Sequence, residues 1–159
     1  MIALVGFMGA GKTTVGRLLA DQARVPFLDS DHVIEARAGR PIPEIFAADG
    51  EPAFRALEHA VIADLLAGLD VVLALGGGAP GHDQTRALLK PLPVAFLRVS
   101  FARALARTGA DGNRPMLARP DLPAVFAARQ RAYEDVATIT VDVDDREPDD
   151  VAKEIAARL

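Results

Sequence analysis

The stretch GFMGAGKTT, residues Gly6–Thr14, follows directly on the apolar run IALV of Ile2–Val5 and decides how the chain folds. It fits the pattern G-x-x-x-x-G-K-[ST], with Lys12 and Thr13 at its end, and it lies between a predicted strand and a predicted helix. Its glycines lack the spacing of the dinucleotide pattern G-x-G-x-x-G. The stretch therefore predicts a strand, a phosphate-binding loop and a helix that together bind a nucleoside triphosphate.

The chemistry of this loop predicts what each part of it does. Glycines let consecutive backbone N–H groups turn inward around a phosphate, and the N-terminus of the following helix adds a positive partial charge. Lys12 is expected to reach the β- and γ-phosphates, and the hydroxyl of Thr13 is expected to bind Mg²⁺. We expect the nucleotide to lie against Gly9, Ala10, Gly11, Lys12, Thr13 and Thr14.

Short apolar runs alternate with helical patterns along the chain. Most of the runs are apolar on both faces and predict strands at Ile2–Val5, Pro26–Leu28, Val71–Leu75, Val94–Val99 and Thr138–Val143. Helices are predicted at Lys12–Gln22, Asp31–Ala38, Pro52–Ala67, Asp83–Leu89, Phe101–Arg107, Leu122–Val136 and Asp149–Leu159. The alternation is typical of an α/β fold, a doubly wound parallel sheet of five strands with helices on both faces, in one domain over residues 1–159.

The composition narrows the class of protein. Half of the 159 residues are apolar and a quarter are charged, as in ordinary globular proteins. The formal net charge of −4 argues against non-specific binding of nucleic acid. No apolar run approaches the roughly 18 residues of a membrane span, and the absence of cysteine suits a reducing compartment. We expect a cytoplasmic monomer that binds neither nucleic acid nor membrane.

Two carboxylates follow the second predicted strand in the segment LDSD. Asp29 and Asp31 are two residues apart, so their side chains would share one face of an extended chain. They would lie at the carboxyl end of the strand, where open α/β sheets bind ligands. One carboxylate could lie near Mg²⁺ and the other could take a proton from an acceptor hydroxyl. The alternative is that one of them caps the helix that begins near Asp31.

Three further segments offer polar groups to an acceptor. The consecutive glycines Gly76–Gly78 would let backbone N–H groups approach a ligand closely. In GEPAFRALE, Arg55 and Glu58 are three residues apart on one helical face, where an ion pair could orient the arginine. In ARQRAYED, either Arg129 or Arg131 could meet an anionic substrate. Between these segments, TGADGNRPMLARPD at residues 108–121 has the length and composition expected of a lid.

Taken in order and spacing, six segments of the chain resemble the shikimate kinases. They are GFMGAGKTTVGRLLA, LDSD, GEPAFRALE, LALGGGA, NRPML and ARQRAYEDVA, and the resemblance extends over essentially the whole chain. It implies a P-loop kinase fold with a lid at about 108–121 and acceptor-binding helices at about 31–67. It also implies ATP and Mg²⁺ as cofactors, and phosphorylation of the 3-hydroxyl of shikimate to give shikimate 3-phosphate and ADP, a step of chorismate and aromatic amino acid biosynthesis.

The resemblance implies a role for each acceptor-site residue. Asp31 would bind the hydroxyls of shikimate and act as the base, while Asp29 would lie near the magnesium ion. Arg55 and Arg129 would bind the carboxylate of shikimate, and Gly76–Gly78 would contact the acceptor through their backbone. Bidentate arginines at one end and a carboxylate at the other suit an acid with three hydroxyls.

On the nucleotide side, the resemblance implies roles for three more residues. Arg114 would reach over the triphosphate, Arg107 would stack on the adenine, and Pro148 would lie in a second segment that contacts the adenine. Lys12, Mg²⁺ and Arg114 would neutralise the charge on the phosphoryl group during transfer.

Two questions stay open at this level. Arg131 stands where shikimate kinases frequently carry proline, so that the choice between Arg129 and Arg131 depends on the register with Tyr133, which favours Arg129. The function also has alternatives, namely a kinase for another polyol acid such as gluconate, or a regulatory module that binds ATP without turnover. Such a module would be expected to lack Lys12, Asp31 or Arg114, and all three are present.

Overall fold

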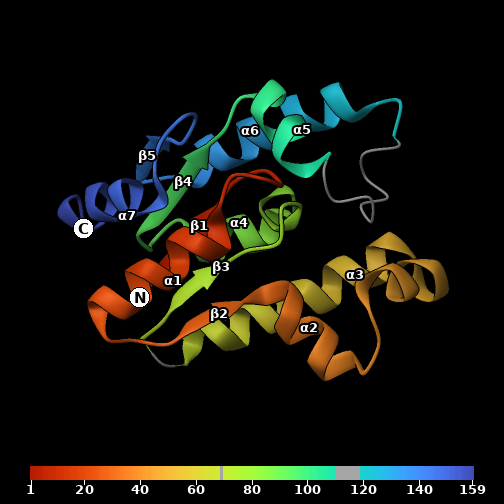
Figure 1. Cartoon of the computed structure of the whole chain (residues 1–159). Coiled ribbons are helices and arrows are strands. Elements are labelled where there is room, and N and C mark those ends of the chain that lie inside the picture. The colour runs from red at the N-terminus through yellow and green to blue at the C-terminus, as the bar shows by residue number, and fades with distance from the viewer. Residues whose placement is uncertain (69, 110–118) are drawn as a thin grey trace.

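A parallel sheet of five strands forms the centre of the chain, in a computed structural model that describes residues 1–68, 70–109 and 119–159 (Figure 1). The strand order is β2-β3-β1-β4-β5. The strands are β1 (Ile2–Val5), β2 (Phe27–Asp29), β3 (Val72–Ala74), β4 (Val94–Arg98) and β5 (Ile139–Asp142). All of the pairings are parallel, which confirms the predicted α/β fold.

Helices connect the strands and cover both faces of this sheet. They are α1 (Lys12–Ala23), α2 (Ser30–Ala38), α3 (Ile42–Ala67), α4 (Asp83–Leu89), α5 (Phe101–Thr108), α6 (Leu122–Val136) and α7 (Pro148–Ala157). A short 3-10 helix, η1 (Ala79–Gly81), precedes α4. Helices α1 and α7 pack together on one face, and α3, α4 and α6 lie on the other (Figure 1). Among the described residues, no helix is long and apolar enough to cross a membrane.

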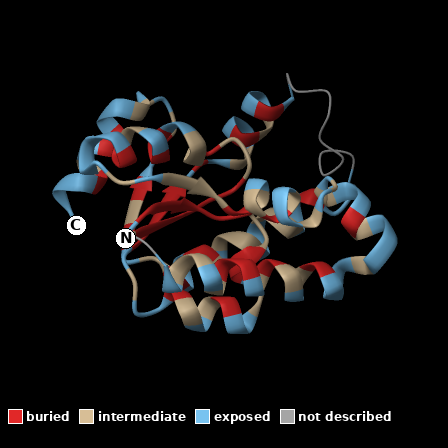
Figure 2. Ribbon diagram, turned by 90° about the horizontal axis from the view of Figure 1, so that it is seen from below, coloured by how far each residue is buried: buried red, intermediate tan, exposed pale blue. Residues whose placement is uncertain are grey.

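The main core lies in the sheet and between the sheet and its helices. The central strand β1 is buried along its whole length, with Leu4 opposite Ala74 on one side and Ala95 on the other. Figure 2 shows the central strands as a buried layer between helices whose outer faces are exposed, while β2 at one edge of the sheet is half-buried. Burial on both faces explains why β1, β3 and most of β4 are apolar without alternation.

A second, smaller core joins α2 to α3, side by side in Figure 1. Its buried members are Ile34, Ile45, Phe54 and Val61. This cluster lets the pair of helices pack as a unit beside the sheet.

Helix α3 begins ten residues earlier than the predicted helix at Pro52. Its first part runs from Ile42 to a break at Gly50, where φ is 82° and ψ is 168°. Prolines at residues 41, 43 and 52 made this segment resemble a loop, but proline is tolerated in the first turn of a helix. The break at Gly50 separates two helical segments, each of which starts with proline in its first turn.

Candidate active site

A cavity of about 680 Å³ opens beyond the carboxyl ends of β1, β2 and β3. Most of the predicted site residues line it, namely Gly9, Gly11, Lys12, Thr13, Thr14, Asp29, Asp31, Arg55, Gly76, Gly77, Gly78 and Arg129. The predicted phosphate loop and the predicted acceptor groups therefore share one cavity. Arg114 and most of the predicted lid lie outside the described residues.

The phosphate loop forms one wall of the cavity. Gly9 and Gly11 have φ of 77° and 89°, in the left-handed region that glycine favours. Gly11 is the N-cap of α1 and has no side chain, so the N-terminus of this helix faces the cavity with its N–H groups uncovered by a cap. Lys12 Nζ donates to the carbonyl oxygen of Gly6 at 2.8 Å, which holds the ammonium group over the loop.

Three predicted nucleotide-side residues lie behind this wall and do not line the cavity. Ala10 is buried beneath the loop. Arg107, on α5, donates to the carbonyl oxygens of Gly9 at 3.1 Å and Val143 at 3.0 Å. It therefore ties the phosphate loop to the segment between β5 and α7. Pro148, half-buried, is the first residue of α7, directly after that segment.

Asp29 and Asp31 take different positions at the end of β2. Asp29 is the N-cap of α2, and its Oδ1 accepts a hydrogen bond from the backbone N–H of Asp31 at 3.0 Å. The capping alternative is thus confirmed for Asp29, which also lines the cavity. Burial raises the pKa of the Asp31 carboxyl, and the charge of Asp29 raises it further, while Lys12 and Arg55 act in the opposite direction.

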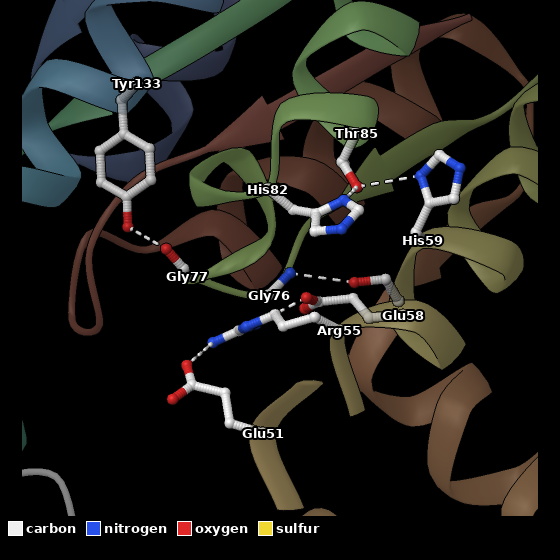
Figure 3. Close-up of polar contacts among 10 residues, drawn as sticks. Glu51, Arg55, Glu58, His59, Gly76, Gly77, His82, Thr85 and Tyr133 are labelled. Atoms are coloured by element: carbon white, nitrogen blue, oxygen red, sulfur yellow. Dashed lines mark hydrogen bonds and ion pairs between the residues drawn. The ribbon is translucent and has the colours of Figure 1, made fainter. Parts of the chain in front are cut away.

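Arg55 is held from several sides on the second segment of α3. Its Nη1 donates to Glu58 Oε2 at 2.6 Å, which confirms the predicted ion pair (Figure 3). Glu58 is buried, and burial raises the pKa of its carboxyl despite the neighbouring guanidinium. The Arg55 guanidinium carbon also lies 5.9 Å and 5.2 Å from the ring centroids of Phe46 and Phe54. These contacts fix the plane of a cation that lines the cavity.

Arg129 approaches the cavity from α6. Its guanidinium carbon lies 5.7 Å from the centroid of the Phe7 ring. Burial lowers the pKa of this guanidinium, and the nearby cations Arg55 and Arg119 lower it further. Arg131, by contrast, is exposed and does not line the cavity. The geometry therefore favours Arg129 as the arginine that meets an anionic substrate.

The three glycines after β3 make room for these side chains. A Cβ on Gly76 would collide with the Asp31 carboxylate and would lie 3.0 Å from Glu58 Oε1. A Cβ on Gly77 would lie 3.2 Å from Arg129 Nη1, and one on Gly78 would lie 2.7 Å from Arg55 Cζ. Each glycine of Gly76–Gly78 thus accommodates a different charged side chain of the acceptor site.

Hydrogen bonds hold this glycine turn in place from two helices. The N–H of Gly76 donates to Ser30 Oγ at 2.9 Å, at the start of α2. The hydroxyl of Tyr133, on α6, donates to the carbonyl oxygen of Gly77 at 2.6 Å (Figure 3). Tyr133 is fully buried, and burial raises the pKa of its phenol. The turn is therefore a fixed wall against which the Arg55 guanidinium lies.

Comparison of the whole chain with known proteins identifies its family. The family model described as shikimate kinase matches residues 8–159. Shikimate kinases of Thermobifida fusca and Pseudomonas syringae pv. syringae are 46% and 47% identical to the chain, cover 100% and 99% of it, and are themselves covered over 94% and 95% of their length. The chain belongs to the shikimate kinase family.

Solved structures extend the comparison to the fold of a shikimate kinase. A shikimate kinase from Acinetobacter baumannii, solved in complex with shikimate, is 40% identical, with a TM-score of 0.92 over 99% of this chain and 90% of that one. A gluconokinase from Sinorhizobium meliloti has a TM-score of 0.59 at 20% identity over 98% of this chain and 89% of that one, so it shares the fold alone.

Several residues on the cavity wall were missed by sequence reasoning. They are Met8, Ile42, Phe46, Glu51, Phe54, Leu75 and Arg119. The aromatic rings of Phe46 and Phe54 come from the two segments of α3, the first of which was not predicted as a helix. Arg119 stands at the end of a segment rich in arginine, glycine and proline, and its spacing gave no sign that it would face the cavity.

Proposed function

We propose that this protein transfers the γ-phosphoryl group of ATP to the 3-hydroxyl of shikimate and releases shikimate 3-phosphate and ADP. One observation carries the proposal: Arg55, Arg129 and Asp31 converge around the glycine turn in the cavity that also contains the phosphate loop. Membership of the shikimate kinase family and the related structure solved with shikimate support the same substrate.

The charges of the cavity suit an acid that carries hydroxyl groups. The carboxylate of shikimate would lie between Arg55 and Arg129, whose forked N–H groups match its two oxygens. Both guanidiniums lie against aromatic rings and are partly withdrawn from water, so that they lose little freedom on binding. The hydroxyls would then face the Asp31 carboxylate, on the side of the cavity toward the phosphate loop.

The reacting hydroxyl needs a group that takes its proton. Asp31 lies between the two walls, and its raised pKa makes it a stronger base than a carboxylate in water. It would accept the proton as the hydroxyl oxygen attacks the γ-phosphorus and the bond to the leaving ADP breaks. Close placement of the two reactants would favour this transfer over hydrolysis by water.

On the other wall, the loop would hold the triphosphate of ATP. The backbone N–H groups over residues 9–14 would surround the β-phosphate, and Lys12 would exchange its bond to the Gly6 carbonyl for the phosphate oxygens. We assign the adenine to the side of Arg107 and Pro148, where α5 and the start of α7 meet the phosphate loop. Arg114 is assigned to the triphosphate by family resemblance.

The residues present fit a magnesium ion. The Thr13 hydroxyl and the Asp29 carboxylate line the same cavity and supply hard oxygen ligands. The described residues contain no cluster of three or more His, Cys, Asp or Glu side chains that could hold a metal. Magnesium in kinases relies on one or two protein groups and on substrate phosphates, so Thr13 and Asp29 suffice. The ion, when bound, neutralises phosphate charge.

An assay of ADP release with three acceptor conditions tests the proposal. Shikimate, gluconate and no added acceptor are compared at saturating ATP and Mg²⁺. We expect turnover with shikimate at least about a hundredfold above the other two, since a site that pairs a substrate's charged and hydroxyl groups rejects poor matches strongly. Faster turnover with gluconate would mean that gluconate, not shikimate, is the acceptor. Equal ADP release in all three conditions would mean that the protein only hydrolyses ATP.

Three broader expectations stay predictions. They are that residues 1–159 form one domain, that the protein is a monomer, and that it works in the cytoplasm. Light scattering of the purified protein with and without both substrates checks the second of these.

A further inference from the structure

Arg119 brings a third guanidinium to the cavity beside Arg55 and Arg129. It lies just before α6, and Asp121 binds it through two hydrogen bonds, from Nε at 2.9 Å and from Nη2 at 2.7 Å. This bidentate pair fixes the plane of the guanidinium. Both N–H groups of Nη1 take no part in it, so the Arg119 fork has donors left for a second carboxylate.

Glu51 is the nearest candidate for that second carboxylate. It stands at the break of α3, lines the same cavity, and its Oε1 lies 3.6 Å from Arg55 Nη2 (Figure 3). Its side chain is 65% exposed, so no packing holds it in this place. Glu51 and Arg119 line the same cavity, and the charge of Glu51 contributes to the raised pKa of Arg119 after the larger effect of Asp121.

Glu51 lies against Arg55 on a side that an acidic substrate would also approach. Arg55 uses Nη1 for the buried Glu58, and Glu51 approaches the other terminal nitrogen, Nη2. A substrate carboxylate at Arg55 would compete with Glu51 for the remaining N–H donors of the guanidinium, and two carboxylates so close to one another would repel. We therefore expect Glu51 to leave Arg55 when the substrate binds.

We propose that Arg119 receives Glu51 when the acceptor's carboxylate replaces it at Arg55. Arg119 is then a positioning residue for the acceptor, acting through Glu51 and not through the substrate itself. The inference rests on the proposed function only in that the acceptor carries a carboxylate. It gives a role to a second cation that lines the same cavity as Arg55 and the exposed carboxylate of Glu51.

A double-mutant cycle with Arg119→Gln and Glu51→Gln tests the exchange. In the otherwise native enzyme, Arg119→Gln leaves Glu51 without a new partner, so we expect the KM for shikimate to rise about three- to fivefold, the range of a partly exposed ion pair. The KM for ATP and kcat are expected to stay within a factor of about two. In the Glu51→Gln background no carboxylate needs a partner, and the same change should alter the KM for shikimate by less than about 1.5-fold.

Two controls separate this role from general effects. Arg131→Gln removes the same charge from an exposed position on α6 that does not line the cavity, and it should leave both KM values unchanged. Arg119→Lys keeps the charge and should restore most of the affinity for shikimate. Thermal unfolding of each variant confirms that the fold is intact.

The outcomes are distinguishable. An equal rise in KM in both backgrounds would mean that Arg119 acts on the substrate directly and would overturn the exchange, as would no rise in either. If the native enzyme turns over another acid in place of shikimate, the proposed function fails, and the same cycle measured on the KM for that acid still decides the exchange.

Discussion

Gly9 and Gly11 in the phosphate loop have left-handed φ angles, whereas Gly76–Gly78, all within the described part of the chain, do not. Gly11 has open space around it and serves the path of its own backbone, which must curl around a phosphate, while Gly9 also lies tightly against α5. The glycines after β3 serve their neighbours, because Asp31 and Arg55 occupy the space of a Cβ on Gly76 and Gly78, and a Cβ on Gly77 would lie tightly against Arg129. The same residue type thus builds the two walls of one cavity for different physical reasons.

The nucleotide wall is formed largely by one stretch of the chain, whereas the acceptor wall is formed by segments far apart in the sequence. The nucleotide wall comes mostly from one continuous segment, Gly9–Thr14, which Arg107 ties to the segment after β5. The acceptor wall collects side chains from α2, α3, α6 and the turn after β3. Changes in the first wall should affect ATP, and changes in the second should affect shikimate or the chemical step.

The largest effect is expected from Asp31→Asn, which removes the proposed base. kcat should fall by about 10²- to 10⁴-fold, the usual contribution of general base catalysis, while the affinity for ATP persists. Because burial raises the pKa of this carboxyl, its ionised form costs stability at neutral pH, so the variant should unfold at the same temperature or higher. Near-normal kcat would remove Asp31 from the mechanism.

A smaller effect is expected from Arg129→Ala, which tests the acceptor wall alone. The KM for shikimate should rise about 10- to 100-fold, since a charge-assisted bidentate contact is lost, and the KM for ATP should change little. Arg131→Ala is the matched control on the same helix and should have little effect on either value. If Arg131→Ala weakens shikimate binding instead, the substrate binds Arg131 and the assignment of Arg129 to the acceptor wall is wrong.

Glycine replacements test the comparison itself. Gly78→Ala places a methyl group against Arg55 and should raise the KM for shikimate about tenfold, since overpacking typically costs 1–3 kcal/mol. Gly11→Ala meets no atom within 4 Å but forces a left-handed φ, so it should weaken ATP binding by a similar factor. Gly81→Ala, with no neighbour within 4 Å, is the control. Weaker binding of the same substrate in both Gly78→Ala and Gly11→Ala would contradict the distinction between the two walls.

The smallest effect is expected in the pH dependence of kcat/KM for shikimate. Asp31 must be ionised to act as a base, so activity should rise with pH through its raised pKa and level off above it. The negative charge of Glu35 contributes to that rise, after burial and Asp29. Glu35→Gln should therefore move the acid limb to lower pH by a fraction of a unit, and its amide oxygen can still accept from the Ile42 N–H. A shift to higher pH would contradict the assignment.

Much of the fold and part of the site could be predicted from the sequence. Buried parallel strands require apolar residues on both faces, and the spacing of Gly11, Lys12 and Thr13 needs no partner elsewhere in the chain. The ion pair of Arg55 with Glu58 was predicted for a similar reason, since one turn of helix brings them together. Sequence reasoning missed the first segment of α3, because its prolines also suit a loop.

What the sequence by itself determined is the strand–loop–helix unit at the N-terminus, the alternation of strands and helices, and the residue types that an acidic acceptor needs. Only the tertiary structure decided which arginine of α6 lies in the cavity and that Glu51 stands beside Arg55 with Arg119 at the same rim. It also decided that a Cβ on Gly76 or Gly78 would collide with Asp31 or Arg55. The reason is that local conformation depends on neighbours along the chain, whereas free space and electrostatic distance depend on packing between segments far apart in it.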